Sequence, residues 1–314
     1  MTEPLKILFM GTPEFALASL ERLAESKDNV IALVCQPDKP KGRGMKLESC
    51  PTKKWAEQRN IRVIQPEKCK DPGFVGEAKK LAPDLIVVAS FGQILPEELL
   101  QIPQYGAINV HSSLLPKYRG ASPVAYAILN GDKETGVTSM QIVKKLDAGP
   151  ILLQRKIPID PEDTAGTLTE KLACLGAELL AETIEGLKAG RIKPTPQDES
   201  KAVYAPMLRK EQGLINWQEP AEVIARKVRA FNPWPGAFVG HGDQLIKIWK
   251  ASAAEGKGEP GTVLEAHKKW IEVACGQGSL RITELQPAAR KRMTPEAFLA
   301  GHKLQPGQIF TLGA

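Results

Sequence analysis

The 314-residue sequence lacks features that mark several large classes of protein. No segment approaches the roughly 20 consecutive apolar residues that span a bilayer. The apolar stretch at residues 5–10 is too short for a secretory signal, and no small-residue cleavage site follows it. The five cysteines are scattered and show no Cys-x-x-Cys spacing, which argues against a disulfide framework and a zinc site. We therefore expect a cytoplasmic protein that has no membrane association and requires no metal.

Sequence motifs of common enzyme classes are missing as well. The segment Gly11-Thr12-Pro13 follows the first apolar run but lacks the Gly-x-Gly-x-x-Gly spacing that binds a pyrophosphate. The chain contains neither a Gly-Lys-Ser/Thr phosphate loop nor a Gly-x-Ser-x-Gly nucleophile elbow. These absences argue against a nucleotide-binding protein and against an α/β-hydrolase.

The length and the distribution of charge indicate two parts. A chain of 314 residues with 42% hydrophobic residues exceeds the usual size of one domain. Residues 201–314 hold 16 Lys and Arg against 10 Asp and Glu, so the whole formal excess of +6 lies in this part. Such an asymmetry is typical of a surface that binds a polyanion, although a solvated Lys-rich face gives the same count.

The first part of the chain alternates short apolar runs with helical patterns. The runs that predict strands are residues 7–10, 30–35, 85–89, 107–110 and 137–143. Helical spacing of apolar residues predicts helices between most of them, including residues 15–24 and 125–129. This order predicts an α/β fold with a doubly wound, mostly parallel, Rossmann-like sheet. Ligands of such sheets bind outside the carboxyl ends of the strands.

The second part begins after a long amphipathic helix predicted for residues 166–189. Residues 190–205, rich in Pro, Lys and Asp, are predicted to be a linker. Beyond it we predict a helix at residues 221–231 and strands at residues 245–249, 261–264, 270–274 and 280–285. We therefore expect domains at residues 1–189 and 206–314, the second a small β-barrel of the oligonucleotide-binding type, with an antiparallel sandwich as the alternative.

Three polar residues at strand ends suggest a catalytic site. Asn109 and His111 are two residues apart on a predicted strand, so both side chains point to one face. An amide and a protonated imidazole aimed at one point can stabilise the oxyanion of an acyl-transfer intermediate. Asp147, in a tight turn after the next strand, is the best partner to orient His111 and could relay a proton from an attacking amine.

The motifs around these residues resemble those of the folate-dependent formyltransferases. The shared motifs are residues 109–111, residues 113–116, residues 118–120 and Asp147, and the similarity extends from residues 7–15 to residues 231–235. The resemblance implies a formyltransferase fold, with Asn109, His111 and Asp147 as the catalytic residues. Relatives often carry glycine at the position of Ser112, a change that we expect to be tolerated.

The resemblance also implies a folate site and a formyl donor, 10-formyltetrahydrofolate. The residues implied to bind the folate are Ser113, Leu114, Leu115, Pro116, Phe91, Gly92, Gln93, Ile94 and Leu95. Without the resemblance, residues 91–95 are expected to be core, since they end a buried strand.

A basic loop follows the second predicted strand. Residues 36–48 form a long connection without predicted secondary structure, and it carries Lys39, Lys41, Arg43 and Lys46. The resemblance implies that this loop binds the acceptor end of a tRNA, with Arg43 central. The predicted reaction is therefore transfer of the formyl group to the α-amino group of initiator methionyl-tRNA, by a protein that we expect to be a monomer.

Other functions have less support in the sequence. A Ser-His-Asp hydrolase would need Ser112 or Ser113 beside His111, yet serines that directly follow the histidine are poorly placed to donate to its ring. In a non-catalytic RNA-binding protein the Asn-x-His pair would have no role. Within the family, a glycinamide ribonucleotide enzyme would need neither second domain nor basic loop. A sugar-nucleotide formyltransferase or a formyltetrahydrofolate hydrolase could share the two-part layout.

Overall fold

The computed structural model describes residues 3–41, 46–241 and 244–310, and these residues form two compact units. The first unit comprises residues 1–123, 134–158 and 169–206, and the second comprises residues 124–133, 159–168 and 207–314. The predicted boundaries at 189 and 206 remain a proposal. No helix within the described residues is both long and apolar enough to cross a membrane.

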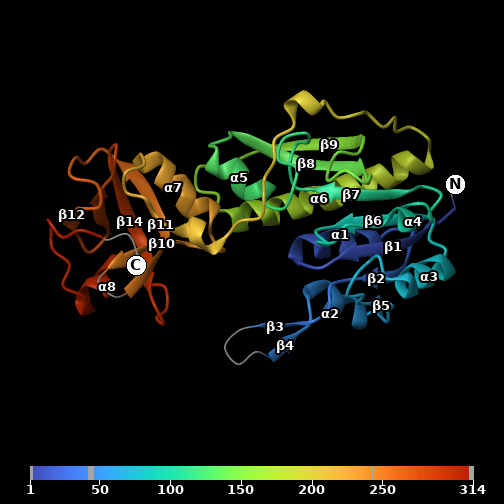
Figure 1. The fold of residues 1–314 in the computed structure, drawn as a ribbon, viewed down its shortest axis with the longest axis horizontal. Coiled ribbons are helices and arrows are strands. Elements are labelled where there is room, and N and C mark those ends of the chain that lie inside the picture. Colours follow the sequence, from blue (N-terminus) through green and yellow to red (C-terminus); the bar gives the residue numbers. More distant parts are fainter. Residues whose placement is uncertain (1–2, 42–45, 242–243, 311–314) are drawn as a thin grey trace. The chain divides into compact units, whose positions relative to one another are not determined.

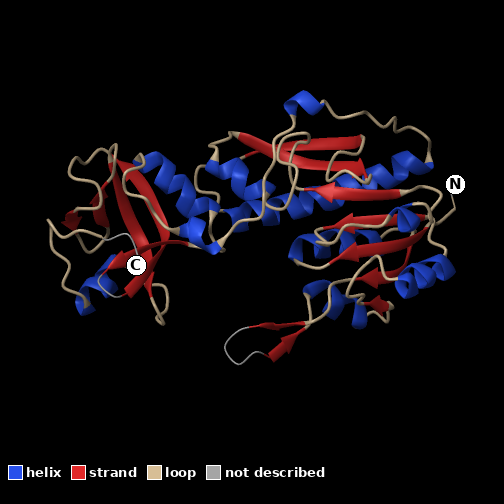
Figure 2. Ribbon diagram, in the orientation of Figure 1, coloured by secondary structure: helices blue, strands red, loops and turns tan. Residues whose placement is uncertain are grey.

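A seven-stranded sheet forms the centre of the first unit (Figures 1 and 2). Its order is β5-β2-β1-β6-β7-β8-β9. The strands are β1 (Lys6–Gly11), β2 (Asn29–Val34), β5 (Val63–Ile64), β6 (Leu85–Ala89), β7 (Ala107–His111), β8 (Glu134–Gln141) and β9 (Ile151–Pro158). The first five pair in parallel, whereas β7–β8 and β8–β9 pair antiparallel. The prediction of a mostly parallel α/β sheet is therefore confirmed.

Helices cover both faces of this sheet. The helices of the first unit are α1 (Glu14–Ala24), α2 (Pro51–Glu57), α3 (Pro72–Leu81), α4 (Glu97–Leu100) and most of α6 (Ala165–Lys188), whereas α5 (Pro123–Leu129) lies almost entirely in the second unit. Phe74 of α3 and Leu99 of α4 share a core with inward residues of β1, β2 and β6. On the other face, Gly176 of α6 lies against Val110 of β7 and Phe15 of α1. Both faces are buried, which explains the continuous apolar runs of the central strands.

Local signals in the sequence set the ends of several helices. Asp71 caps α3 by accepting a hydrogen bond from the Gly73 amide, and Pro72 occupies the first turn, where no amide donor is needed. Helix α6 matches the predicted residues 166–189 within one residue at each end, because Leu168 and Leu172 begin a buried stripe along it.

The second unit contains a five-stranded antiparallel sheet with the order β10-β11-β14-β13-β12 (Figure 2). Its strands are β10 (Ala237–His241), β11 (Gln244–Ala254), β12 (Val263–Ala266), β13 (Ile271–Ala274) and β14 (Ser279–Pro287). Helix α7 (Ala221–Ala230) packs on β11, and α8 (Pro295–Gly301) packs on β14. The four predicted strands are present, and β10 was not predicted. Within the described ranges β10 and β12 are edge strands, so closure of the barrel stays a prediction.

Candidate active site

Asn109 and His111 lie together on strand β7, as predicted. Both point to one face of the sheet, while Val110 points to the other, where its Cγ1 would be 2.9 Å from a Cβ at Gly176. His111 is buried, with 6% of its surface exposed, and Asn109 is partly exposed. The Asn109 amide makes no side-chain hydrogen bond to any other residue in the described part of the chain. Its donors are therefore available to a bound molecule.

The backbone carbonyl of Tyr118 fixes the imidazole of His111. The ring Nε2 lies 2.9 Å from this oxygen, and because a carbonyl only accepts, Nε2 carries a proton. The other ring nitrogen, Nδ1, lies 3.8 Å from Oδ2 of Asp147, which is beyond hydrogen-bond distance but close enough for charge attraction. The sequence predicted the Asp147 contact but gave no signal for the Tyr118 carbonyl.

Asp147 reaches His111 by a route that differs from the expected one. It was expected at the end of a strand beside β7, but β8 runs antiparallel to β7, with Gln141 opposite Ile108. The end of β8 therefore lies at the far edge of the sheet, and the loop 142–150 folds back toward His111. There, Oδ2 of Asp147 accepts a hydrogen bond of 2.8 Å from the amide of Gly120. The φ of Asp147 is +48°, a left-handed conformation that is uncommon for a residue other than glycine.

The loop 112–120, which carries the Tyr118 carbonyl, is attached to strands β8 and β9. The fully buried Thr138 hydroxyl donates to the Ser113 carbonyl at 2.6 Å and accepts from the Leu115 amide at 3.1 Å. The Gln154 side-chain amide donates to Thr138 Oγ1 at 2.9 Å and to the Leu115 carbonyl at 2.8 Å. These bonds give the loop a single conformation beneath His111.

The arrangement does not support a Ser-His-Asp hydrolase. Ser113 is fully buried, and its hydroxyl donates to the Lys117 carbonyl at 2.6 Å. Among the described residues, no hydrogen bond joins Ser112 or Ser113 to the ring of His111. Because Nε2 is already bonded to Tyr118, the ring has no nitrogen placed to activate either serine.

The predicted folate residues after β6 differ in exposure. Phe91 and Leu95 belong to the core, as their apolar character suggested without the resemblance. The Gln93 side chain accepts a hydrogen bond from the Cys69 amide at 2.9 Å. Gly92 is exposed and Ile94 is 81% exposed. Of this group, Ile94 and the backbone at Gly92 are the parts open to a ligand.

The other predicted folate residues form the loop that bears Ser113. Leu115 is buried, and Ser113 uses its hydroxyl within the loop. Leu114 and Pro116 are partly exposed, and Leu114 packs so closely on β8 that a Cβ at Gly136 would lie 2.6 Å from its Cδ2. In this loop, therefore, mainly Leu114, Pro116 and the backbone present surface.

The predicted basic loop is partly a β-hairpin, which corrects the expectation of a connection without secondary structure. Strands β3 (Lys39–Lys41) and β4 (Lys46–Glu48) pair antiparallel and extend away from the α/β sheet (Figure 1). Each strand has only three residues, two of them charged, which is too few for an alternating apolar pattern, so no strand was predicted. Lys39 donates to Gln36 Oε1 at 2.7 Å. Arg43 lies outside the described residues.

A polar cluster holds the base of this hairpin. Asp38 accepts hydrogen bonds from Lys53 at 2.7 Å and from Gln65 at 2.9 Å, and these donors lower the pKa of its carboxyl group.

A cysteine near this cluster has a lowered pKa. A hydrogen bond from the Cys35 thiol is the largest cause that lowers the pKa of Cys50 to about 6. Cys50 also contacts the Thr52 hydroxyl at 3.3 Å. Cys50 therefore has thiolate character at neutral pH.

Several basic side chains of the second unit have structural roles within it. Arg226 donates to the Leu129 carbonyl at 3.1 Å, and burial lowers the pKa of Arg229. The guanidinium carbon of Arg292 lies 3.8 Å from the ring centre of Trp249. These contacts reduce the number of cations that could bind phosphate from this unit.

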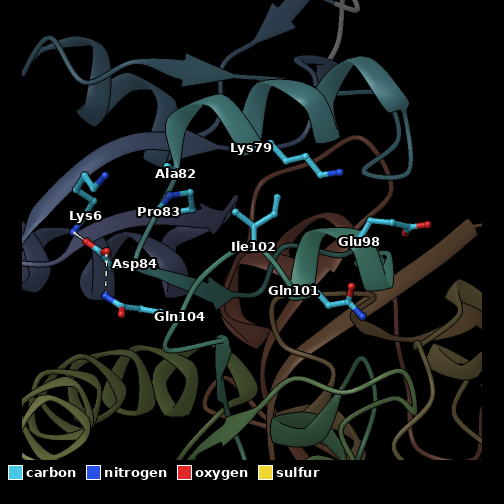
Figure 3. Close-up of a pocket in the computed structure, with 9 residues that line it drawn as sticks. All are labelled: Lys6, Lys79, Ala82, Pro83, Asp84, Glu98, Gln101, Ile102 and Gln104. Carbon is cyan, nitrogen blue, oxygen red and sulfur yellow. Dashed lines mark hydrogen bonds between the residues drawn. The ribbon is translucent and has the colours of Figure 1, made fainter.

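A hollow of about 630 Å³ lies where the amino ends of β1 and β6 meet the edge of the first unit's sheet, away from the carboxyl end of β7 (Figure 3). It is lined by Lys6, Lys79, Ala82, Pro83, Asp84, Glu98, Gln101, Ile102 and Gln104. The Asp84 carboxylate accepts hydrogen bonds from the backbone amide of Lys6 at 2.8 Å and from the Gln104 side chain at 3.2 Å. No predicted site residue lines this hollow, so we place the chemistry at the carboxyl edge, where open α/β sheets bind ligands. Within the described residues, no group of three or more His, Cys, Asp or Glu side chains could hold a metal ion.

Comparisons with known proteins match both parts of the chain to models of one family. Residues 5–184 match the family model described as formyl transferase, and residues 207–303 match the model of the formyl transferase C-terminal domain. The chain is 50% identical over 304 residues to the methionyl-tRNA formyltransferase of Trichlorobacter lovleyi, covering 97% of this chain and 96% of that protein. It is 49% identical over 308 residues to the protein of that name from Caldanaerobacter subterraneus, covering 97% and 99%.

A solved structure supports the same fold. The N-formyltransferase from Helicobacter canadensis, in complex with folinic acid and dTDP-3-aminofucose, superposes with a TM-score of 0.66 at 20% identity. The alignment covers 92% of this chain and 100% of that one. From the match of both family models and the close relatives of full length, we conclude that the chain belongs to the formyl transferase family.

Proposed function

We propose that this protein transfers the formyl group of 10-formyltetrahydrofolate to the α-amino group of methionyl initiator tRNA, for the initiation of translation. The observation that carries the proposal is identity of about half of all residues, across both units, with proteins named methionyl-tRNA formyltransferase. The N-formyltransferase from Helicobacter canadensis aligns over a similar share of the chain, but at 20% identity it supports the fold alone.

The reaction occurs beside Asn109 and His111. The unprotonated α-amine attacks the formyl carbon, a C–N bond forms, and the carbonyl π electrons move to the oxygen. The Asn109 side chain and protonated His111 stabilise this oxyanion. Asp147 stabilises the positive charge on His111 and accepts a proton from the attacking amine through a water molecule. This proton then passes to N10 of the folate as the bond between the formyl carbon and N10 breaks. The products are the formylated amine and tetrahydrofolate, and the proton that the amine loses is the one that N10 gains.

The folate is bound between the loops that follow β6 and β7. The exposed side chain of Ile94 offers apolar contact, and the backbone groups at Gly92 and Leu114 offer hydrogen bonds to a flat heterocycle. The other predicted folate residues support these groups from within, because Phe91, Leu95 and Leu115 are buried. Two further exposed apolar side chains, Leu146 at 55% and Val143 at 40%, lie on the Asp147 loop.

The acceptor tRNA is bound by the basic hairpin. Lys39, Lys41, Arg43 and Lys46 occur within eight residues of the sequence. Strands β3 and β4 form a ribbon that extends from the sheet (Figure 1). A ribbon of this kind can follow a phosphate backbone, and neutralisation of phosphates makes binding depend steeply on salt. We further propose that the protein works as a monomer in the cytoplasm. Its five cysteines are all free, as is usual in a reducing compartment.

The test is single-turnover formylation with labelled 10-formyltetrahydrofolate. Methionyl initiator tRNA, free methionine, glycinamide ribonucleotide and an amino-sugar nucleotide are offered in parallel. We expect label on the charged tRNA alone. Label on another amine would overturn the acceptor, and release as formate would indicate a hydrolase.

The catalytic roles are tested with Asn109→Ala and His111→Ala. Loss of one oxyanion donor typically slows the reaction by about 10²- to 10³-fold. We expect a decrease of this size in the rate at saturating substrates, with an unfolding midpoint close to that of the unchanged protein. Normal turnover in both variants would contradict the assignment.

A further inference from the structure

The segment predicted as a linker, residues 190–205, packs along the proposed catalytic loops of the first unit. It runs back beside β9, where Thr195 and Ile151 exchange two backbone hydrogen bonds of 2.8 Å (Figure 1). Further along, the amide of Arg119 donates to Val203 at 2.8 Å and its carbonyl accepts from Ala205 at 2.7 Å. The segment therefore borders both the loop 112–120 and the loop 142–150.

Gln197 of this segment uses its whole side-chain amide on these loops. Its Nε2 donates to the carbonyls of Asp147 and Gly149, each at 2.8 Å. Its Oε1 accepts from Nε and Nη2 of Arg119, at 3.0 and 2.8 Å. One side chain thus connects the loop that carries Asp147 with the loop that carries the Tyr118 carbonyl.

Arg119 is the anchor for this connection. Its side chain is completely buried, and besides Gln197 it binds Glu199 in bidentate fashion at 3.1 and 2.9 Å. Glu199 also pairs with Lys145 of the Asp147 loop at 2.6 Å. A buried guanidinium with such fixed partners is a rigid support, since removing one partner of a buried charge is strongly destabilising.

The backbone of the Asp147 loop needs such support. Asp147 has a left-handed φ of +48°, a conformation that the surrounding structure must maintain. At Gly149 a Cβ would lie 1.7 Å from the Gln141 carbonyl oxygen, so the loop turns tightly. Gln197 binds the carbonyls of both these residues. It therefore holds the two ends of the turn that orients the Asp147 carboxylate toward Gly120 and His111.

We propose that Gln197 is a positioning residue for formyl transfer: its amide sets the place of the Asp147 carboxylate, anchored by Arg119. This inference rests on the proposed role of Asp147 in catalysis. Misplacement of a catalytic group by about 1 Å can slow a reaction by about 10²-fold. Because the Gln197 amide is used on Arg119 and on the carbonyls of Asp147 and Gly149, its loss should slow the reaction without weakening the binding of the substrates.

The test separates the two halves of the Gln197 side chain. Gln197→Glu keeps an oxygen for Arg119 but places a second oxygen against the carbonyls of Asp147 and Gly149. Glu199→Gln weakens the pairing of Arg119 and leaves the Gln197 amide intact. We expect Gln197→Glu to lower the single-turnover rate by about 10- to 100-fold. The KM values for both substrates should stay within about twofold of those of the unchanged protein. Glu199→Gln should lower the rate far less. Gln58→Ala, an exposed glutamine of the same unit, is the control.

A second measurement shows whether Gln197 acts through Asp147. In the Asp147→Asn background, Gln197→Glu should cost little further rate, because coupled residues are not additive. Should Gln197→Glu not fold, Gln197→Met, of similar size, takes its place, with hydrogen exchange at residues 142–150 expected to rise. If Asp147→Asn is slow while both Gln197 variants react at the normal rate, the positioning role is wrong. If Asp147→Asn itself reacts normally, the proposed catalytic site is wrong instead.

Discussion

Replacing Thr138 by valine tests how the loop beneath His111 is held. Valine has nearly the shape of threonine, so Thr138→Val removes the hydroxyl and little else. The buried hydroxyl serves the Ser113 carbonyl at 2.6 Å and the Leu115 amide at 3.1 Å, and both groups would lose this partner. The Gln154 side chain keeps its bond to the Leu115 carbonyl at 2.8 Å. Two buried backbone groups are therefore the main loss.

The expected size of the effect follows from these two groups. A buried polar group left without a partner costs about 1–3 kcal/mol, and burying one more methyl group returns about 0.8 kcal/mol. We therefore expect the free energy of unfolding to decrease by about 1–5 kcal/mol. For a unit of this size each kcal/mol lowers the unfolding midpoint by about 2–4 °C. The turnover rate should fall as well, because the same loop carries the carbonyl that holds the His111 ring.

Urea unfolding monitored by circular dichroism measures the stability, and single-turnover formylation measures the rate. Thr195→Val is the matched control, since Thr195 is exposed and its side chain bonds to no other described residue. A decrease below about 1 kcal/mol in Thr138→Val would show that the hydroxyl does not carry the loop, because two orphaned groups cost at least about 2 kcal/mol and the methyl group returns only about 0.8 kcal/mol.

Three further predictions concern charge. Cys50, with a pKa of about 6, should react with iodoacetamide at a rate that levels off near pH 7, and a rate that still rises beyond pH 8 would contradict the thiolate. Arg43→Ala should reduce the slope of log affinity for tRNA against log salt concentration by about one. Lys79→Ala, at the opposite edge of the sheet, should leave this slope unchanged. Equal slopes in the two variants would exclude a role of the hairpin in tRNA binding. Two cations lower the pKa of Glu199 to about 2, so its stabilisation is complete above its ordinary pKa of 4.5 and is lost as the pH falls toward 2. Urea unfolding of Glu199→Gln against pH should show a difference that is constant above pH 4.5 and narrows below it.

Much of the fold follows from patterns that are local in the sequence. Apolar runs and helical spacing predict the central strands and helix α6, because burial of both sheet faces leaves a direct trace in residue type. Short elements left no such trace: β5 has two residues, and β3 and β4 have three polar-rich residues each. Only one of the eight residues of strand β9 is buried, and its polar residues break the apolar run, so no strand was predicted there.

The candidate site was predictable where it depends on one strand. Asn109 and His111 share a face of β7 by the alternation of side chains alone. One bond near them joins residues far apart in the chain, Thr138 to Ser113. Another joins His111 to a backbone carbonyl rather than to a side chain. A backbone carbonyl has no signature in residue type, so sequence reasoning could not find the group that holds the ring.

Asp147 shows most clearly how a predicted contact can form through a geometry that the sequence did not indicate. Its distance of 3.8 Å from His111 depends on the antiparallel pairing of β8, on a loop that folds back, and on a segment some 50 residues later that binds this loop through Gln197. Residue types at 109, 111 and 147 specify which groups meet, because the chemistry needs an amide, an imidazole and a carboxylate. The composition of residues 190–205 predicts a linker because the polar side chains of this segment bind neighbouring loops and do not form a helix or strand pattern of their own. A polar connection that fixes the backbone around a catalytic group is therefore part of the active site, and its contacts must be weighed before it is treated as a spacer between domains.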